Sequence, residues 1–374
     1  MEELLNSVPP LTYSVAGQEI AINRPEAIIS NIDVVAYDRG MDPQIAIEAL
    51  AEGYSVLIVD FYSSGLMLLK ELKEYVKSQY PNQTFQEQRE FRNVYRELSH
   101  RLLLIVREQK LVVKKAPEIG WFKILYPNQE EFLLSFPQVQ GLNSSWQWNK
   151  KGIFIPVLNH KIHPWFGTYF PTRFEHLKLF DKWLKRYKGE KKSAMDIGIG
   201  CGVLSFQLLK YGFEKVYGTD TNPNAIVGLH EAQSENKLYS KIDLIFGDLF
   251  TGIKEKTELI VFNPPWLPAP YDTEGLDKAI YYDADLFPRF FADAKKYLQN
   301  DGRLVILFSN LAQVTKTGGE HPIEKEITDG GRFEKELFIQ KEVNPASKKT
   351  KRNQHWRADE KVELWILKKI KPLK

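Results

Sequence analysis

The feature that most constrains the fold is a regular alternation of short apolar segments with helical segments downstream of residue 172. Apolar runs of five or six residues suit strands that are buried on both faces of a sheet. Strands that alternate with helices indicate a parallel sheet with helices packed on both sides. The predicted strands are one that ends at Asp196 and four others at 215–219, 242–246, 258–262 and 303–308.

The end of the chain departs from this alternation. Two candidate strands, at 333–343 and 361–370, follow each other with no long helix between them. Such a pair predicts an antiparallel hairpin at the edge of the parallel strands. We therefore predict an α/β fold. It consists of a doubly wound, mostly parallel seven-stranded sheet with a terminal antiparallel hairpin, plus a smaller N-terminal α/β or α+β domain.

The N-terminal part of the chain has signals of its own. Asp42-Pro43 has the form of an N-cap followed by proline at the first helical position, and 54–60 (YSVLIVD) is typical of a buried strand. The stretch 137–152 is rich in Gln, Asn, Ser and Gly and shows neither helical nor strand period, which predicts a seam between domains. The predicted division is therefore into 1–152 and 153–374.

The strongest local motif is 196–202 (DIGIGCG), at the junction between a predicted strand and a predicted helix. Glycines there let the backbone turn sharply and approach a ligand closely, because no Cβ intervenes. In an open parallel sheet, ligands bind at the carboxyl ends of the strands, beside the point where the strand order reverses. The motif suits a plain glycine-rich turn or a dinucleotide site, although a dinucleotide site needs a glycine where Val203 stands.

Two aspartates follow the next two predicted strands. Asp220, at the end of VYGTD, can accept hydrogen bonds from both hydroxyls of a ribose, which either kind of nucleoside cofactor contains. Asp248, in GDLF, can accept a hydrogen bond from an adenine amino group while Leu249 packs on the ring. An aspartate after a strand is otherwise a common turn residue.

The tetrad Asn263-Pro264-Pro265-Trp266 directly follows the predicted strand at 258–262. Neither proline has an N–H group, so the turn is stiff and presents carbonyl acceptors, to which Asn263 adds its amide oxygen. Such a turn suits an amide or aromatic amine with two N–H donors, and Trp266 offers a face for a planar group. Accepting both N–H bonds favours pyramidal nitrogen and directs its lone pair at an electrophile. The plainer interpretation is a proline-stiffened loop with a core tryptophan.

In combination, DIGIGCG, Asp220, GDLF and NPPW resemble the motifs of the Rossmann-like S-adenosylmethionine-dependent methyltransferases. More narrowly, they resemble the amino-methylating branch with an Asn/Asp-Pro-Pro-aromatic motif. That branch includes HemK-type glutamine methyltransferases, adenine methyltransferases of DNA and RNA, and guanine methyltransferases of ribosomal RNA. The resemblance covers roughly residues 160–374. It implies that 153–374 binds S-adenosylmethionine and methylates a planar amide or exocyclic amino nitrogen, while 1–152 recognises the substrate.

The resemblance also implies roles for individual residues. The catalytic set would be Asn263 and the Pro264 carbonyl, which hold the target nitrogen, and Trp266, which stacks on the substrate. The cofactor set would be Asp196, Gly198, Gly200 and Gly202 in the loop, Asp220 at the ribose, Asp248 and Leu249 at the adenine, and Thr172 near the methionine end. Thr172 also has the spacing of a capping box with Glu175. Trp266 departs from the family, in which Tyr or Phe is commoner, and no metal is implied.

The composition of the chain limits its expected cellular location and its expected binding partners. The apolar runs are too short to cross a bilayer, the N-terminus lacks the order of a signal peptide, and the single cysteine, Cys201, excludes intrachain disulfides. We therefore expect a cytoplasmic protein with no membrane partner, and the oligomeric state is left open. The net charge of +3 divides into −4 for 1–150 and +7 for 151–374, which favours an anionic partner for the second half.

The substrate remains a choice between hypotheses. Between the two closing strands lies 347–357 (SKKTKRNQHWR), with five cationic residues, an aromatic ring and no acidic residue. A rim of this kind suits phosphates and exposed bases, although it also suits an acidic protein surface or a solvated loop. It favours a nucleobase of RNA or DNA over a protein glutamine. A non-catalytic cofactor-binding scaffold is the third hypothesis, against which the intact NPPW argues.

Overall fold

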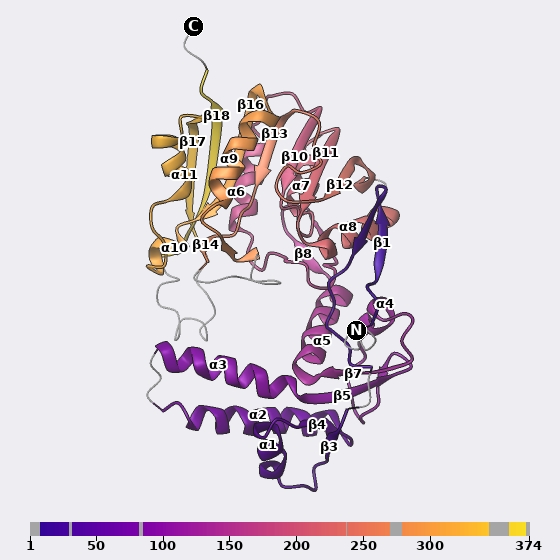
Figure 1. Ribbon diagram of the computed structural model, residues 1–374. Coiled ribbons are helices and arrows are strands. Elements are labelled where there is room, and N and C mark those ends of the chain that lie inside the picture. The colour runs from indigo at the N-terminus through magenta and orange to yellow at the C-terminus, as the bar shows by residue number, and fades with distance from the viewer. Residues whose placement is uncertain are drawn as a thin grey trace, which may run out of the picture. The chain divides into compact units, whose positions relative to one another are not determined.

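A computed structural model describes residues 8–29, 32–81, 85–236, 238–269, 279–343 and 359–371. The chain forms two compact units, one comprising Met1–Leu11 with Asn23–Lys151 and the other Thr12–Ile22 with Gly152–Lys374 (Figure 1). A division at residue 152 assigns 12–22 to the first domain, whereas this hairpin belongs to the second unit. There Tyr13 lies edge-on to Trp165, with 6.2 Å between ring centroids.

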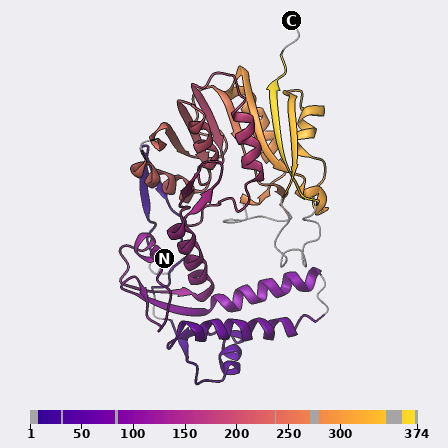
Figure 2. The ribbon, with the colours of Figure 1, turned by 180° about the vertical axis from the view of Figure 1, so that it is seen from behind.

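The second unit is built on a seven-stranded sheet in the order β12-β11-β10-β13-β16-β18-β17 (Figures 1 and 2). Five neighbouring strands, from β12 to β16, are parallel, and β18 is antiparallel to both β16 and β17. The predicted doubly wound sheet with a terminal antiparallel hairpin is therefore confirmed. The main elements are β10 (Ser193–Ile197), α7 (Val203–Lys210), β11 (Lys215–Asp220), α8 (Pro223–Glu235), β12 (Ile242–Phe246), β13 (Thr257–Phe262), α9 (Leu286–Tyr297), β16 (Leu298–Ser309), β17 (Phe333–Glu342) and β18 (Lys361–Lys369).

Shorter elements complete this unit. They are β1 (Thr12–Val15), β2 (Gln18–Ala21), β8 (Ile153–Ile155), β9 (His160–Ile162), α6 (Glu175–Leu184), η2 (Tyr239–Lys241), β14 (Leu267–Pro268), β15 (Tyr281–Tyr282), α10 (Leu311–Val314), α11 (Pro322–Lys325) and η4 (Glu326–Gly330). The start of α8 follows the predicted Asn-Pro signal, because the side chain of Asn222 accepts a hydrogen bond from the Asn224 N–H at 3.1 Å.

Side chains alternate across the sheet and separate its two faces. Met195 and Ile197 share a buried cluster with Phe290 and Phe291 of α9. Asp196 lies between them in sequence, so it points to the opposite face, where it bonds to Ser205 of α7. Strand β13 is buried at every residue, which accounts for its apolar run 259–262.

The first unit is a smaller α/β unit with its own sheet. Its strands β3, β4 and β5 are parallel in that order, and β6 and β7 pair antiparallel with β5. Helix α1 begins as predicted, because Asp42 Oδ1 accepts a hydrogen bond from the Gln44 N–H at 3.0 Å. The elements are β3 (Val34–Tyr37), α1 (Pro43–Ala51), β4 (Ser55–Ile58), α2 (Tyr62–Ser78), α3 (Phe85–His100), β5 (Leu102–Arg107), β6 (Lys110–Leu111), α4 (Trp121–Leu125), β7 (Glu131–Ser135) and α5 (Phe136–Lys151).

The stretch 137–152 was predicted to be an irregular seam, but it forms α5, and the boundary between the two units lies at the end of this helix, between Lys151 and Gly152. The helix buries only Phe136, Val139 and Leu142, which recur every third residue, and its other positions are largely Gln, Asn, Ser and Lys. So narrow an apolar face gives a weak periodic signal. Packing against β5, β7 and α3 stabilises the helix in spite of the modest helix propensity of its polar residues.

The capping box predicted at Thr172 is also wrong. Helix α6 begins at Glu175 with Phe174 as its N-cap residue, and Glu175 accepts a hydrogen bond from the Phe174 N–H at 3.2 Å. Arg173 is instead paired with Glu360, at 2.6 Å between Nη1 and Oε2. This long-range ion pair ties the segment before the helix to a residue 187 positions away. Among the described helices, none is long and apolar enough to cross a membrane.

Candidate active site

The glycine loop lies at the carboxyl end of β10, where the strand order reverses between β11 and β13. Gly198, Gly200 and Gly202 have φ values of 67°, 51° and 79°, which side chains with a Cβ rarely adopt. A Cβ on Gly202 would also lie 2.8 Å from a methyl carbon of Leu229. The positive φ values of the backbone therefore require glycine at these three positions. Without side chains there, a ligand can approach the loop closely.

Asp196 is buried beneath this loop, and only one of its two carboxylate oxygens accepts hydrogen bonds. Its Oδ2 accepts hydrogen bonds from Ser205 N at 2.9 Å and Ser205 Oγ at 2.7 Å, whereas its buried Oδ1 has no hydrogen-bond partner. Burial raises the pKa of Asp196 to about 7, and the two bonds from Ser205 oppose this increase. A buried carboxylate with a free oxygen is suited to pair with a cationic group of a ligand.

Asp220 fixes the loop from the end of β11. Its Oδ2 accepts a hydrogen bond from Gly200 N, and its Oδ1 accepts one from Asn222 N, both at 2.8 Å. Burial raises the pKa of this carboxyl, and the backbone N–H bonds counteract the increase. Each carboxylate oxygen still has acceptor capacity for a ligand hydroxyl. Asp220 can therefore shape the loop and bind a ribose at the same time.

The segment before α6 is attached to the same corner of the unit. Asn222 Nδ2 donates to the Gly167 carbonyl at 2.8 Å, and Asn224 Nδ2 donates to the Phe166 carbonyl at 2.9 Å. The Tyr169 carbonyl oxygen lies 3.7 Å from where a Cβ of Gly200 would stand. The predicted site residue in this segment, Thr172, is exposed. The asparagine anchors were missed because their partners are backbone groups more than 50 residues away.

Asp248 and Leu249 follow β12 at the same edge of the sheet. Asp248 forms an ion pair with Arg289 of α9, whose Nε also lies 2.8 Å from a carboxylate oxygen of Asp285. Leu249 is buried in the cluster beneath α9, and its carbonyl accepts a hydrogen bond from Thr219 Oγ1 at 2.6 Å. The sequence motif did not reveal Arg289, because the pair joins residues 41 positions apart.

The Asn-Pro-Pro-Trp turn begins directly after β13, next to the glycine loop. The last residues of β10 and β13, Ile197 and Phe262, are paired in register, so the two motifs begin side by side. Asn263 Oδ1 accepts a hydrogen bond from the indole N–H of Trp266 at 3.2 Å. The indole in turn lies edge-on to the ring of His176 in α6, with 5.5 Å between centroids. His176 was not singled out by the sequence.

The tertiary structure thus brings DIGIGCG, Asp220, GDLF and NPPW to the carboxyl edge of one sheet. Among the described residues, no group of three or more His, Cys, Asp or Glu side chains could hold a metal ion. The thiol of Cys201, inside the glycine loop, has its pKa raised to about 12 by burial and is protonated at neutral pH. The arrangement can therefore bind a nucleoside-containing, cationic molecule and hold a planar group with N–H donors beside it.

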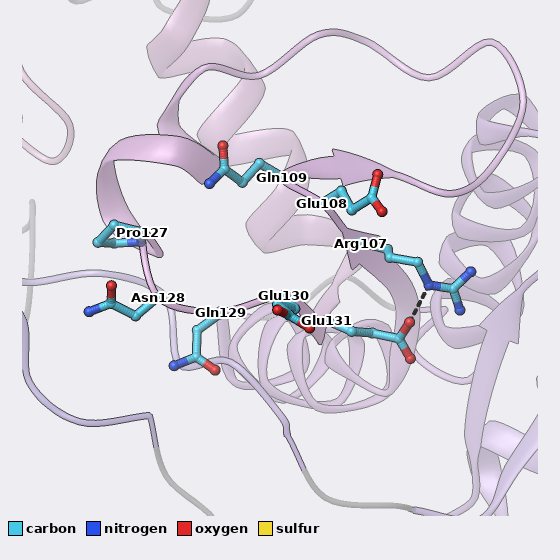
Figure 3. Close-up of a pocket in the computed structure, with 8 residues that line it drawn as sticks. All are labelled: Arg107, Glu108, Gln109, Pro127, Asn128, Gln129, Glu130 and Glu131. Carbon is cyan, nitrogen blue, oxygen red and sulfur yellow. Dashed lines mark hydrogen bonds and ion pairs between the residues drawn. The ribbon is translucent and has the colours of Figure 1, made fainter.

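A separate open pocket lies in the first unit, beside the turn between β5 and β6 (Figure 3). Among the side chains that line it, Arg107 and Glu131 form an ion pair, and both are about half exposed. The turn residues Glu108 and Gln109 also line it. None of the residues that line this pocket is buried, whereas the site at the glycine loop includes the buried carboxyl group of Asp196.

Comparisons with known proteins agree with this assignment of the second unit. A sequence model of the family described as "Methyltransferase small domain" matches residues 178–317. A Methanocaldococcus jannaschii protein named "Putative protein N5-glutamine methyltransferase" is 31% identical over 145 residues, which are 36% of this chain and 68% of that protein.

Two further relatives match over shorter stretches. A ribosomal protein L11 methyltransferase of Lachnospira eligens is 35% identical over 85 residues, which are 22% of this chain and 27% of the relative. The ribosomal RNA small subunit methyltransferase C of Alcanivorax borkumensis is 30% identical over 116 residues, which are 31% of this chain and 32% of the relative. The chain thus spans about a third or less of the length of these two proteins.

Proposed function

Because the chain belongs to the S-adenosylmethionine-dependent methyltransferases, we propose that it methylates a planar amide or exocyclic amino nitrogen of a macromolecule. The observation that supports this chemistry is the position of the Asn-Pro-Pro-Trp turn. It begins at the carboxyl end of β13, in register with the strand that leads into the glycine loop. The nitrogen-binding acceptors and the cofactor loop therefore share one edge of the sheet.

The turn provides what a poorly nucleophilic nitrogen needs. An amide or aryl-amine lone pair is delocalised into the neighbouring π-system. The Asn263 side-chain oxygen and the Pro264 carbonyl can accept both N–H bonds, which favours pyramidal geometry and frees the lone pair. S-Adenosylmethionine supplies an electrophilic methyl group on a sulfonium when bound. Holding the nitrogen at that methyl group in the correct direction is then the main contribution of the protein.

The residues of the glycine loop fit S-adenosylmethionine. The cofactor is cationic at its sulfonium and ammonium groups, and the unpartnered Oδ1 of Asp196 is a buried acceptor suited to positive charge. Asp220, with acceptor capacity on both oxygens, is suited to the ribose hydroxyls. We further propose that Gly198, Gly200 and Gly202 let the cofactor lie close against the backbone of the loop. Asp248, Leu249 and Thr172 would complete the cofactor site.

The raised pKa of Asp196 predicts a pH-dependent contribution to cofactor binding. A bound cation favours the ionised carboxylate, whereas below pH 7 the free protein holds this group increasingly protonated. The advantage of wild type over Asp196→Asn in cofactor affinity should therefore grow as pH rises through about 7 and level off above it. Titration calorimetry of both proteins between pH 5.5 and 8.5 measures the ratio of their Kd values. A ratio that stays constant over this range would contradict the assignment.

The substrate proposal places a nucleobase of RNA or DNA first. Strand β17 is antiparallel to β18, which is antiparallel to β16, so β17 runs in the direction of the parallel strands. The connection between β17 and β18 therefore leaves and returns at the edge where NPPW lies. Its cationic segment, 347–357, lies outside the described residues. A protein glutamine is the second candidate, because the Methanocaldococcus jannaschii relative is named for that activity.

One experiment separates the two substrate classes. The protein is incubated with methyl-labelled S-adenosylmethionine and a cell extract, and the macromolecular product is divided between nuclease and protease digestion. Release of the label by nuclease supports a nucleobase, and release by protease supports a glutamine side chain. Failure to label any macromolecule in several extracts, despite cofactor binding, would favour the scaffold hypothesis.

The cationic segment gives a prediction that salt can check. Replacing Lys348, Lys349, Lys351 and Arg352 with serine is expected to raise KM for the macromolecular substrate at low salt and to leave cofactor affinity unchanged. The difference from wild type should shrink as salt rises, because screening weakens the attraction in both proteins. Steady-state kinetics at salt concentrations from about 25 to about 300 mM test this. Within this range the Debye length falls through ~10 Å, so attraction between exposed charges goes from weakly to strongly screened. An unchanged KM at low salt would remove the main support for the nucleic-acid substrate.

A further inference from the structure

The orientation of the Asn263 side chain decides whether the proposed site can work. One end of a carboxamide is an acceptor, Oδ1, and the other is a donor, Nδ2. Only the oxygen can accept a hydrogen bond from the N–H group of a substrate. Rotation by 180° would present N–H donors to N–H donors, which is repulsive. The enzyme therefore needs a contact that selects one of the two orientations.

Trp266 makes such a contact. The indole Nε1–H is a donor only, so the atom that it bonds at 3.2 Å must be the oxygen of Asn263. A carboxamide oxygen has two acceptor positions, and the indole occupies one of them. The second stays available to the target nitrogen. A phenylalanine at this position would have a similar stacking face but no N–H group to offer.

His176 supports the indole from α6. Its side chain is buried and lies edge-on to Trp266, with an interplanar angle of 89°. Burial lowers the pKa of His176 to about 4, so the ring is neutral at the pH of most assays. Its buried Nδ1 has no hydrogen-bond partner, and the contact of this side chain that bears on the site is the packing of its ring against Trp266. An edge-on ring restricts rotation of the indole and hence keeps Nε1 directed at Asn263.

We propose that Trp266 is a positioning residue that fixes the Asn263 carboxamide with its oxygen available to the substrate, and that His176 holds the indole in place for this purpose. The catalytic part of this inference rests on the proposed function. The structural part does not, since the hydrogen bond and the ring contact exist without substrate. The two parts can therefore be tested separately.

The structural part is tested by NMR of protein labelled with ¹⁵N-tryptophan, without substrate. The Trp266 indole signal is identified by its absence in Trp266→Phe. In Asn263→Ala this signal should shift upfield in the proton dimension and exchange faster with solvent, because the N–H group loses its acceptor. The signal of Trp183 on α6, which packs against Phe180 of the same helix and Tyr187 beyond its end, should stay in place. A Trp266 signal that does not respond to Asn263→Ala would overturn the proposal whatever the substrate is.

The catalytic part is tested by kinetics. Trp266→Phe is expected to lower kcat about five- to tenfold, the effect of one neutral hydrogen bond, with KM changed less than twofold. In the Asn263→Ala background the same substitution should have no further effect, because Trp266 acts through Asn263. Trp183→Phe is the matched control and should retain wild-type kcat. An equal loss from Trp266→Phe in both backgrounds would show that Trp266 does not act through Asn263.

His176 is tested by a pair of substitutions. His176→Phe keeps an aromatic edge and should retain most of kcat, whereas His176→Leu should lower it towards the value of Trp266→Phe. Thermal denaturation of both variants reports any general loss of stability, and the Trp266 indole signal reports the local effect. If both variants keep the wild-type kcat and indole signal, His176 has no positioning role. If no amide or amino substrate is methylated at all, the proposed function fails while the NMR result still decides the geometry.

Discussion

Replacing Asn263 with alanine is expected to lower kcat by about 10²–10³ while the affinity for S-adenosylmethionine changes less than twofold. In the proposed mechanism the Asn263 oxygen accepts a hydrogen bond from the target nitrogen, and its contribution grows as that nitrogen becomes pyramidal in the transition state. The cofactor contacts assigned to Asp196, Asp220 and the glycine loop are untouched by the substitution. Single-turnover kinetics measure the chemical step, and calorimetry measures cofactor affinity.

A second variant shows whether the loss of kcat in Asn263→Ala arises from the missing acceptor oxygen. Asn263→Asp keeps an oxygen that can accept from both the substrate and the Trp266 indole, and aspartate occurs at this position in the family that the motif resembles. It should therefore retain more activity than Asn263→Ala. If Asn263→Ala keeps kcat within about threefold of wild type, the NPPW turn has only a structural role.

The second large effect is expected at Asp220. Replacement by alanine removes the proposed acceptor for both ribose hydroxyls, and the loss of two hydrogen bonds to a carboxylate costs about 3 kcal/mol, or roughly a hundredfold in Kd. The structure adds a further reason for a large effect, because the same carboxylate bonds the backbone N–H groups of Gly200 and Asn222. The variant is therefore expected to lose loop order as well as a direct contact.

Calorimetry with S-adenosylmethionine measures the Asp220→Ala effect, and thermal denaturation without cofactor measures how much arises from the loop. Asp243→Ala is a suitable control, since Asp243 stands on the neighbouring strand in an ion pair with Lys215 in which both side chains are almost half exposed. That variant should bind the cofactor like wild type. Unchanged cofactor affinity in Asp220→Ala, or tight binding of NAD by the wild type, would contradict the assignment.

The sequence determined the core of the catalytic unit because its signals are local. Strands buried on both faces are largely apolar, so the strand that ends at Asp196 and those at 258–262 and 303–308 could be recognised from short windows, although the structure begins the last of these at Leu298. The DIGIGCG loop was recognisable for the same reason, because positive φ at three positions nearly requires glycine. The Asn222-Pro223 helix start also depends on adjacent residues alone.

Local signals failed where distant residues decide the conformation. Thr172 and Glu175 have the spacing of a capping box, yet the helix begins only at Glu175, and the residue after Thr172, Arg173, pairs with Glu360, 187 positions away. Helix α5 was predicted as a seam because three buried residues leave little periodic signal, while its contacts with β5 and β7 are tertiary.

The site shows the same division between sequence and tertiary structure. The residue types of NPPW, Asp196 and Asp220 allowed a prediction of the groups that the site binds, because donor and acceptor capacity belongs to each side chain alone. Only the fold placed NPPW and the glycine loop side by side, through the register of β10 with β13. Only the fold brought the His176 ring against Trp266, since ring contacts between a helix and a strand end depend on packing distances that no periodicity encodes.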